Sequence, residues 1–117
     1  MSTPQLREAR SRITMRTQQG WVVADRLYRP PMLVTADLVG TVADLTLAGL
    51  DARQLPDVGA IDLLLLGTGA EFHFADRDFL QSALARGWRV EAMDSAAAAR
   101  TFNVLVAEDR LVAALLF

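Results

Sequence analysis

Hydrophobic and polar positions divide the chain into a β-rich first half and a second half in which strands and helices alternate. The pattern predicts strands at 13–17, 21–28, 32–34, 42–47, 61–66, 88–93 and 111–117. It predicts helices at 76–86 and 96–107, and a short helical turn at 50–55 that ends before Pro56. A turn at Gly20 joins the first two strands, and Gly40 is expected to interrupt the chain. Residues 71–74 fit either a short edge strand or an extended loop.

The clearest strand is the continuous apolar run at 61–66, which lies between Gly59 and Gly67. Such a run is typical of a strand that is buried on both faces of a sheet. The strand–helix–strand–helix–strand order that follows implies two crossover connections, and we expect strands 61–66 and 88–93 to be parallel neighbours. The sequence therefore predicts an α/β fold: a single three-layer domain with a central mixed β-sheet, two main helices and an N-terminal β-hairpin.

The first predicted helix has one apolar stripe, formed by Phe79, Leu80, Ala83 and Leu84. Gly87 follows at the position where a glycine commonly ends a helix.

Composition narrows the function classes. At 117 residues the chain suits one domain, 1–117, and its 52% hydrophobic content supplies a core. The 12 basic and 14 acidic residues give a net charge of −2, which disfavours nucleic-acid binding because that requires a basic surface. All the basic residues are arginines, so a Schiff-base lysine and a P-loop lysine are excluded. The absence of cysteine excludes disulfides, thiolate metal sites and a cysteine nucleophile.

The beginning of the sequence is not expected to be a secretory signal. Residues 1–10 are polar, contain Pro4 and lack periodicity, so they are expected to form a loose arm or a short capping turn. The first 12 residues hold no apolar core of a secretory signal, and no apolar run approaches the ~20 residues that span a bilayer. We expect a cytoplasmic protein, since a chain without cysteine fits a reducing compartment. We also expect no membrane span and no cofactor.

Several segments of the second half carry a resemblance to a known family. They are Leu-Leu-Leu-Gly-Thr-Gly at 64–69, Val-Glu-Ala-Met-Asp-Ser at 90–95 and Ala-Ala-Arg-Thr-Phe-Asn-Val-Leu at 98–105, with Gly87, Ala107, Glu108 and Arg110. In this combination, roughly from residue 13 to residue 116, the chain resembles the small-domain family of the mitochondrial respiratory complex I assembly factor 3. That family also includes the adipogenesis-associated domain protein of animals and many bacterial and archaeal proteins.

The resemblance implies a three-layer α/β fold with a central mixed sheet. It brings no enzymatic activity with it, because none is established for the family as a whole, and complex I assembly is a role of the mitochondrial branch. Two positions depart from the family pattern. Relatives often carry a basic or polar stretch and a proline after Gly69, which residues 71–74 lack, and Phe102 replaces the usual tyrosine, so no phenolic hydroxyl is present there.

One candidate ligand site lies where two predicted parallel strands end. Gly67, Thr68 and Gly69 follow the first of these strands, and Asp94 follows the second. Parallel sheets bind ligands at this end, and glycines let a ligand approach the backbone. Two purely structural roles for these residues stay open. Thr68 could bond to the backbone in a tight turn, and Asp94 or Ser95 could cap the helix that follows.

Asn103 and Val104 on the second predicted helix are the remaining candidates. Helical spacing places Asn103 at the border of the apolar stripe, where it would bind either a ligand or the backbone. Val104 points away from the stripe and is a candidate interface residue. His73, the one histidine, lies between two phenylalanines and has no partner at metal-ligand spacing, so no catalytic residue and no metal ligand is predicted.

Two hypotheses for function follow. The first is a non-catalytic binding or assembly module with a protein partner, a class compatible with a homo-oligomer. It rests on missing catalytic motifs, high apolar content and the family resemblance. The alternative is a small-molecule binding protein or enzyme, with a pocket near the glycines that follow strand 61–66 and near Asp94.

Overall fold

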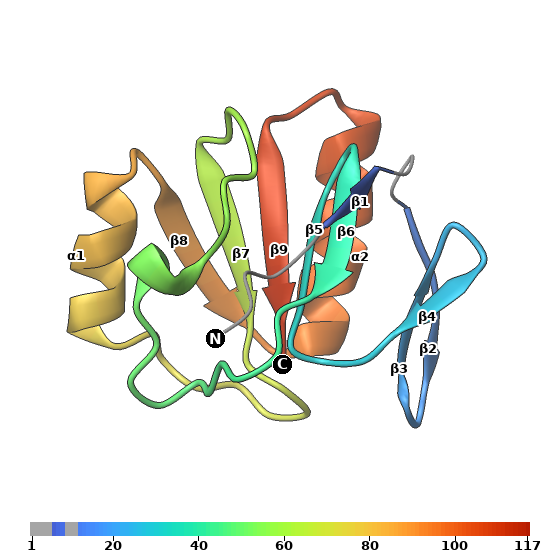
Figure 1. Ribbon diagram of the computed structural model, residues 1–117, viewed down its shortest axis with the longest axis horizontal. Helices are drawn as coiled ribbons and strands as arrows, with labels where there is room; N and C mark the ends of the chain where they lie inside the picture. The colour runs from blue at the N-terminus through green and yellow to red at the C-terminus, as the bar shows by residue number, and fades with distance from the viewer. Residues whose placement is uncertain (1–5, 9–11) are drawn as a thin grey trace.

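A six-stranded mixed sheet forms the centre of the molecule, with the strand order β1-β6-β5-β9-β7-β8 (Figure 1). The computed structural model describes residues 6–8 and 12–117. The strands of this sheet are β1 (Arg7–Glu8), β5 (Met32–Thr35), β6 (Leu38–Thr41), β7 (Leu63–Gly67), β8 (Arg89–Met93) and β9 (Val112–Leu116). Strand β7 is parallel to both β8 and β9, whereas β5 is antiparallel to β9 and β6. The predicted parallel pairing of strands 61–66 and 88–93 is therefore confirmed.

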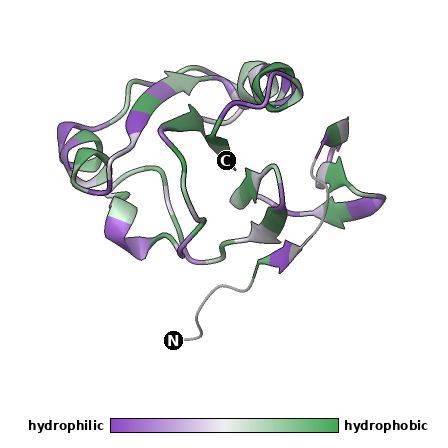
Figure 2. Ribbon diagram, turned by 90° about the horizontal axis from the view of Figure 1, so that it is seen from above, coloured by the Kyte–Doolittle hydropathy of each residue, from purple (hydrophilic) through white to green (hydrophobic). Residues whose placement is uncertain are grey.

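A second, three-stranded antiparallel sheet and three helical segments complete the fold. The elements are β2 (Ile13–Thr17), β3 (Gly20–Val23), β4 (Arg26–Tyr28), the 3-10 helix η1 (Ala52–Gln54), α1 (Arg77–Ala85) and α2 (Ser95–Ala107). Figure 2 shows α1 and η1 on one face of the central sheet, and α2 and the three-stranded sheet on the other. The predicted three-layer α/β class with two main helices is confirmed.

The apolar run of β7 contributes side chains to two hydrophobic clusters, one on each face of the central sheet. Side chains along a strand point alternately to opposite faces, so Leu63 and Leu65 pack toward α2 while Leu64 and Leu66 pack toward α1. All five residues of β7 are buried. Each leucine therefore belongs to one of two hydrophobic clusters, on opposite sides of the same sheet.

Helix α1 covers one face of the sheet with part of its predicted stripe. Phe79 and Ala83 are buried, at 1% and 0% exposure. Leu80 and Leu84, on the same apolar stripe, are exposed, at 41% and 69%. The stripe is wider than the contact with the sheet, because a helix of nine residues on an outer strand reaches the core with only one side. Gly87 ends the helical segment at a φ of +81°, as predicted.

The predicted return strand at 21–28 is instead two strands joined by a tight turn. Ala24 and Asp25 both adopt a left-handed conformation, with φ of 49° and 63°. Two consecutive residues of this kind reverse an antiparallel strand pair. The expected hairpin is thus a three-stranded meander, and an alanine at positive φ is the reason that the turn carries no obvious sequence signal.

The predicted strand at 42–47 is wrong, as is the predicted break at Gly40. Gly40 lies within β6, buried opposite Leu33 of β5. Pairing with β5 ends at Thr41, and Val42 N then donates to Pro31 O at 2.8 Å before the chain turns at Asp44 (φ 71°). The apolar residues after Thr41 pack over the α1 side of the sheet as an irregular cover.

Two smaller expectations also have an outcome. Residues 71–74 form an extended loop between β7 and α1, one of the two alternatives for this segment. Within the arm expected at 1–10, Arg7–Glu8 forms β1 and pairs with β6, which differs from a loose arm. The rest of that arm lies outside the described residues, except for Leu6. Among the described residues, no helix combines the length and the apolar character needed to cross a membrane.

Candidate functional site

The carboxyl ends of β7 and β8 lie side by side, at the place where an open α/β sheet commonly binds its ligand. The connection from β7 runs to α1 on one face of the sheet, whereas the connection from β8 runs to α2 on the other. Strand-end loops that leave in opposite directions normally open a crevice between them. The sequence candidates Gly67, Thr68, Gly69 and Asp94 all lie here.

In this structure the space between the two strand ends is closed by hydrogen bonds. Thr68 N donates to Met93 O at 2.9 Å. Gly69 N donates to Ser95 Oγ at 2.8 Å, and Ser95 N donates to Gly69 O at 2.8 Å. The backbone groups that would face a ligand at this turn therefore bind the start of α2 instead.

Thr68 shapes the loop that follows β7. Its side chain is 5% exposed, and Oγ1 donates to Glu71 O at 2.7 Å. The same oxygen accepts from His73 N at 3.1 Å. These contacts match the alternative in which Thr68 forms a tight turn and bonds to the backbone.

Ser95 is the residue of this junction that sequence reasoning undervalued. It is fully buried, and its Oγ donates to Phe117 O at 2.8 Å while it accepts from Gly69 N. A Cβ placed on Gly67 would lie 2.8 Å from Ser95 Oγ and 3.0 Å from Ser95 Cα. One hydroxyl thus joins the ends of β7 and β9 to α2, and a side chain on Gly67 would push them apart. A serine just after an N-cap, facing a Gly-Thr-Gly turn in the parallel neighbour, is the signal that could have found it.

Asp94 caps helix α2. Its Oδ1 accepts a hydrogen bond from Ala97 N at 2.9 Å, and the side chain is half-buried. The expected cap at this position is confirmed. A carboxylate oxygen at a helix N-terminus also interacts favourably with the helix dipole.

Asn103 lies elsewhere on α2. It follows Asp94 by nine residues, about 13 Å along a helix, and faces β2. Its Oδ1 accepts from Ile13 N at 2.9 Å and its Nδ2 donates to Ile13 O at 2.7 Å. Both functional groups of the amide thus hold β2 against α2, and the structure does not bring Asn103 together with Gly67 and Asp94.

Val104 is 56% exposed on the outer side of α2. A shallow cavity of about 310 Å³ beside it is lined by Arg12, Asn103, Val104, Val106 and Ala107. This part of the surface is apolar in character, since three of the five lining side chains are aliphatic.

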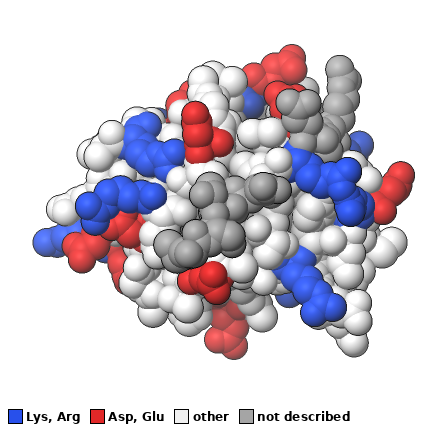
Figure 3. Space-filling model, viewed as in Figure 1, with Lys and Arg blue, Asp and Glu red and all other residues white. Residues whose placement is uncertain are grey.

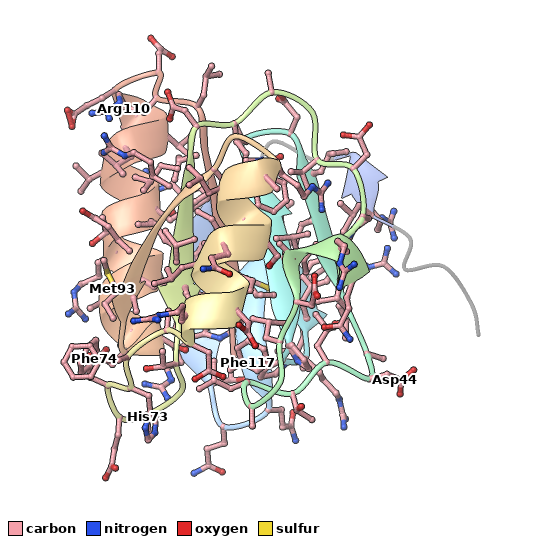
Figure 4. All side chains as sticks on the ribbon, turned by 90° about the vertical axis from the view of Figure 1, so that its left-hand side faces the viewer. Asp44, His73, Phe74, Met93, Arg110 and Phe117 are labelled. Atoms are coloured by element: carbon pink, nitrogen blue, oxygen red, sulfur yellow. The ribbon has the colours of Figure 1, made fainter. Side chains whose placement is uncertain are left out.

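A larger cavity, about 460 Å³, lies on the α1 side of the β7 carboxyl end. Its lining combines Leu66 of β7, the loop residues Leu47, Ala48, Leu50, His73 and Phe74, and Asp76 and Phe79 at the start of α1. Figure 4 shows His73 and Phe74 at the lower end of the molecule, near Met93. Asp76 precedes α1 without a side-chain capping bond. The cavity can take a small apolar group, with an imidazole and a carboxylate at its rim.

Among the described residues, the charged groups near this cavity form no metal centre. No group of three or more His, Asp or Glu side chains in the described part of the chain is placed to hold a metal ion. Beyond Asp76, the carboxylate of Asp51 is already paired, because Arg53 Nη2 lies 2.7 Å from Asp51 Oδ2. The side-chain hydrogen bond from Arg53 lowers the pKa of Asp51. On the face drawn in Figure 3, acidic and basic groups are interspersed, with no broad basic area among the described residues.

Fold and site together define a small α/β domain whose strand-end turns are bound to its own helix, with exposed apolar side chains on both helices. Residues 13–117 match the family described as "Protein of unknown function (DUF498/DUF598)". The chain belongs to this family, as its resemblance in sequence predicted.

Relatives of known name extend the comparison. The chain is 31% identical over 105 residues to NADH dehydrogenase (ubiquinone) 1 alpha subcomplex assembly factor 3 of Xenopus tropicalis, covering 86% of this chain. It is 36% identical over 87 residues to the protein of the same name from Danio rerio, covering 74% of this chain. The chain spans about half the length of these relatives, 57% and 49% respectively.

The fold also matches solved structures. A crystal structure of a Bordetella parapertussis protein has a TM-score of 0.82 and 30% sequence identity, over 93% of this chain and 96% of that one. Domains of this architecture therefore occur as bacterial proteins of similar size.

Proposed function

We propose that this protein is a non-catalytic binding module that acts through a protein partner, in the manner of an assembly factor. The observation that carries the proposal is the family membership, with relatives of 31% and 36% identity that are named as assembly factors. Because the matched region is about half of each relative, the proposal concerns this domain alone.

The geometry of the strand ends supports the proposal. Enzymes of open α/β folds commonly place catalytic groups in the crevice between such ends. Here Thr68 N donates to Met93 O, and the N–H groups of Gly69 and Ser95 each donate to an oxygen of the other residue. Hydrogen-bonded backbone groups of this kind stabilise the domain and leave few polar groups to act on a substrate.

Exposed apolar side chains supply a means of protein contact. Val104 projects from α2 beside a cavity lined by aliphatic groups. Apolar surface of this kind, rimmed by polar groups such as Arg12, is common at protein interfaces. The proposal assigns Val104 to the surface that meets the partner.

Affinity capture from an extract of the native cells tests this proposal. The wild-type protein and two variants, Val104→Glu and Gln81→Glu, are compared. Gln81 is exposed on α1, on the opposite side of the sheet, and its substitution adds the same charge. We expect one set of proteins to be retained by wild type and Gln81→Glu and lost by Val104→Glu. Retention of no protein above background by the wild type would contradict the proposal.

The cavity beside β7 favours a second candidate, a small-molecule binding protein. At about 460 Å³, with apolar walls and His73 and Asp76 at the rim, its size and character suit a small ligand. Native mass spectrometry of the protein purified from its own cells would show an added mass. An Ala48→Trp substitution, which fills the cavity, should remove that mass if the ligand occupies the cavity.

A cytoplasmic location is part of the proposal. A sequence without cysteine supports it, since it fits a reducing compartment. Fractionation of the native cells, followed by immunodetection, tests it: recovery in the membrane or extracellular fraction would contradict it.

A further inference from the structure

Strand β8 leaves one edge of the central sheet open. It is the last strand in the order β1-β6-β5-β9-β7-β8 and, within the part of the chain that the structure describes, it pairs only with β7. Figure 4 looks toward this side of the molecule, where β8 runs between α1 and α2. A sheet edge exposes backbone groups that can pair with another strand.

The ladder shows which backbone groups of β8 are available. Arg89 N donates to Asp62 O, and Met93 O accepts from Thr68 N, each at 2.9 Å. The N–H and C=O groups of successive strand residues point to alternate sides, so Arg89, Glu91 and Met93 face β7. Val90 and Ala92 therefore direct their backbone N–H and C=O groups outward, and none of the described residues pairs with them.

Exposed leucines flank this edge on the α1 face. Phe79 and Ala83 of α1 pack on the sheet. On one flank of the helix, Ser82 Oγ accepts from Ala52 N of η1 at 3.0 Å. At 100° per residue, Leu80 and Leu84 lie on the opposite flank, which is the side of the β8 edge.

Two opposite charges lie on the other face of β8. Arg89 and Glu91 are both exposed and, two residues apart, point to the same side of the sheet. Figure 2 shows the resulting alternation of hydrophilic and hydrophobic bands along this strand. One face of the edge is thus charged and self-complementary, and the other is apolar.

We propose that the β8 edge binds the β8 edge of a second copy of this chain, antiparallel, with Val90 opposite Val90 on the two-fold axis. In this register Val90 of each copy donates to and accepts from its counterpart. Arg89 then lies opposite Glu91 of the second copy, twice per dimer, at the short separation of directly opposed residues. The two six-stranded sheets join into one, and Leu80 and Leu84 flank the new pairing.

The charges of Arg89 and Glu91 favour this register of the two β8 strands, and they favour a second copy of the chain over another protein. Shifting one copy by the smallest step that keeps outward residues paired places Glu91 opposite Glu91, where like charges repel. An isologous pairing makes each favourable contact twice, because the same strand supplies both partners. A strand of another protein would need this arginine–glutamate order by coincidence.

Sedimentation equilibrium of the full chain at low and moderate salt tests the inference. We expect a wild-type dimer. Arg89→Glu alone and Glu91→Arg alone each place like charges opposite one another, and each should raise the dimer dissociation constant by about tenfold or more. The double variant Arg89→Glu/Glu91→Arg restores opposite charges and should return the constant to near the wild-type value.

Controls separate a specific effect from unfolding or from total charge. Gln81→Glu adds a charge on the outer side of α1 and should leave the dimer unchanged, whereas Leu84→Arg, at a side chain 69% exposed, should weaken it. Far-ultraviolet circular dichroism confirms that each variant is folded. A wild-type monomer at several hundred micromolar, or a dimer that the double variant fails to restore, would overturn the inference. The dimer test uses residues of β8 and α1, whereas the capture experiment uses Val104 of α2. The inferred dimer and the proposed function can therefore fail separately.

Discussion

Gly67 and Ser95 approach so closely that a methyl group does not fit between them. A Cβ on Gly67 would lie 2.8 Å from Ser95 Oγ, 3.0 Å from Ser95 Cα and 2.7 Å from Leu116 Cδ2. Gly67 ends β7, Ser95 begins α2, and Leu116 ends β9. The Gly-Thr-Gly sequence is explained at this position by packing between the chain's own elements.

Gly67→Ala should therefore destabilise the protein. The leucine side chain can move, but the Ser95 backbone cannot move without displacing α2. Overpacking of this kind costs about 1–3 kcal/mol. Urea unfolding followed by circular dichroism measures the change, and an unfolding free energy equal to that of the wild type would show that the junction is looser than the structure indicates.

Ser95→Ala should remove two hydrogen bonds from a buried site. Gly69 N loses its acceptor and Phe117 O loses its donor. Groups left unpaired in this way cost about 1–3 kcal/mol. Thr46→Ala serves as the control, because the Thr46 hydroxyl is exposed and donates only to the nearby Ala48 O. We expect the control to stay within about 0.5 kcal/mol of wild type in the same urea titration.

Asn103→Ala should loosen the three-stranded sheet more than the central one. The Asn103 amide supplies both hydrogen bonds to Ile13, at the start of β2. Amide hydrogen exchange measured by residue should show lost protection at 13–28, with β7 and β9 little changed. Arg100→Ala, at an exposed position of the same helix, is the matched control. Equal protection of 13–28 in both variants would contradict the anchoring role.

Asp94→Ala and Asp94→Asn should differ in stability. An asparagine keeps a side-chain oxygen for Ala97 N, whereas alanine removes the cap at a cost of about 1 kcal/mol. Thermal unfolding of the two variants measures this difference. If both lose stability equally, the carboxylate charge matters more than the capping hydrogen bond.

The second half of the fold could be predicted from local sequence pattern. The apolar run of β7, the helix ended by Gly87, and the Asp94 cap each specify their element within a few residues. These signals are strong because burial on both faces of a strand and the end of a helix each demand particular residue types. The parallel pairing of β7 with β8 followed from the order of strands and helices along the chain.

The first half shows where local pattern fails. Apolar residues at 42–47 suggested a strand, but Val42 is buried without one because the segment covers the core as irregular chain. The turn at Ala24 and Asp25 lacks the glycine or asparagine that positive φ values normally favour. In both places tertiary packing decides the conformation, and no single-sequence pattern reports it.

The candidate site could be located in part. Sequence order placed Gly67 and Asp94 at neighbouring strand ends, which the parallel pairing of β7 with β8 requires. It could not show that Ser95 fills the space between them, nor that Asn103 faces β2. Those facts depend on side-chain directions that only the assembled layers fix.

Strand β9 has a consequence for the order in which the molecule is made. It pairs with β5 on one side and with β7 on the other, so it alone joins the two portions of the central sheet. Of the strands that the structure describes, β9 is the last to be synthesised. Until it is made, the nascent chain holds two half-sheets, each with an open edge at the place where β9 will insert.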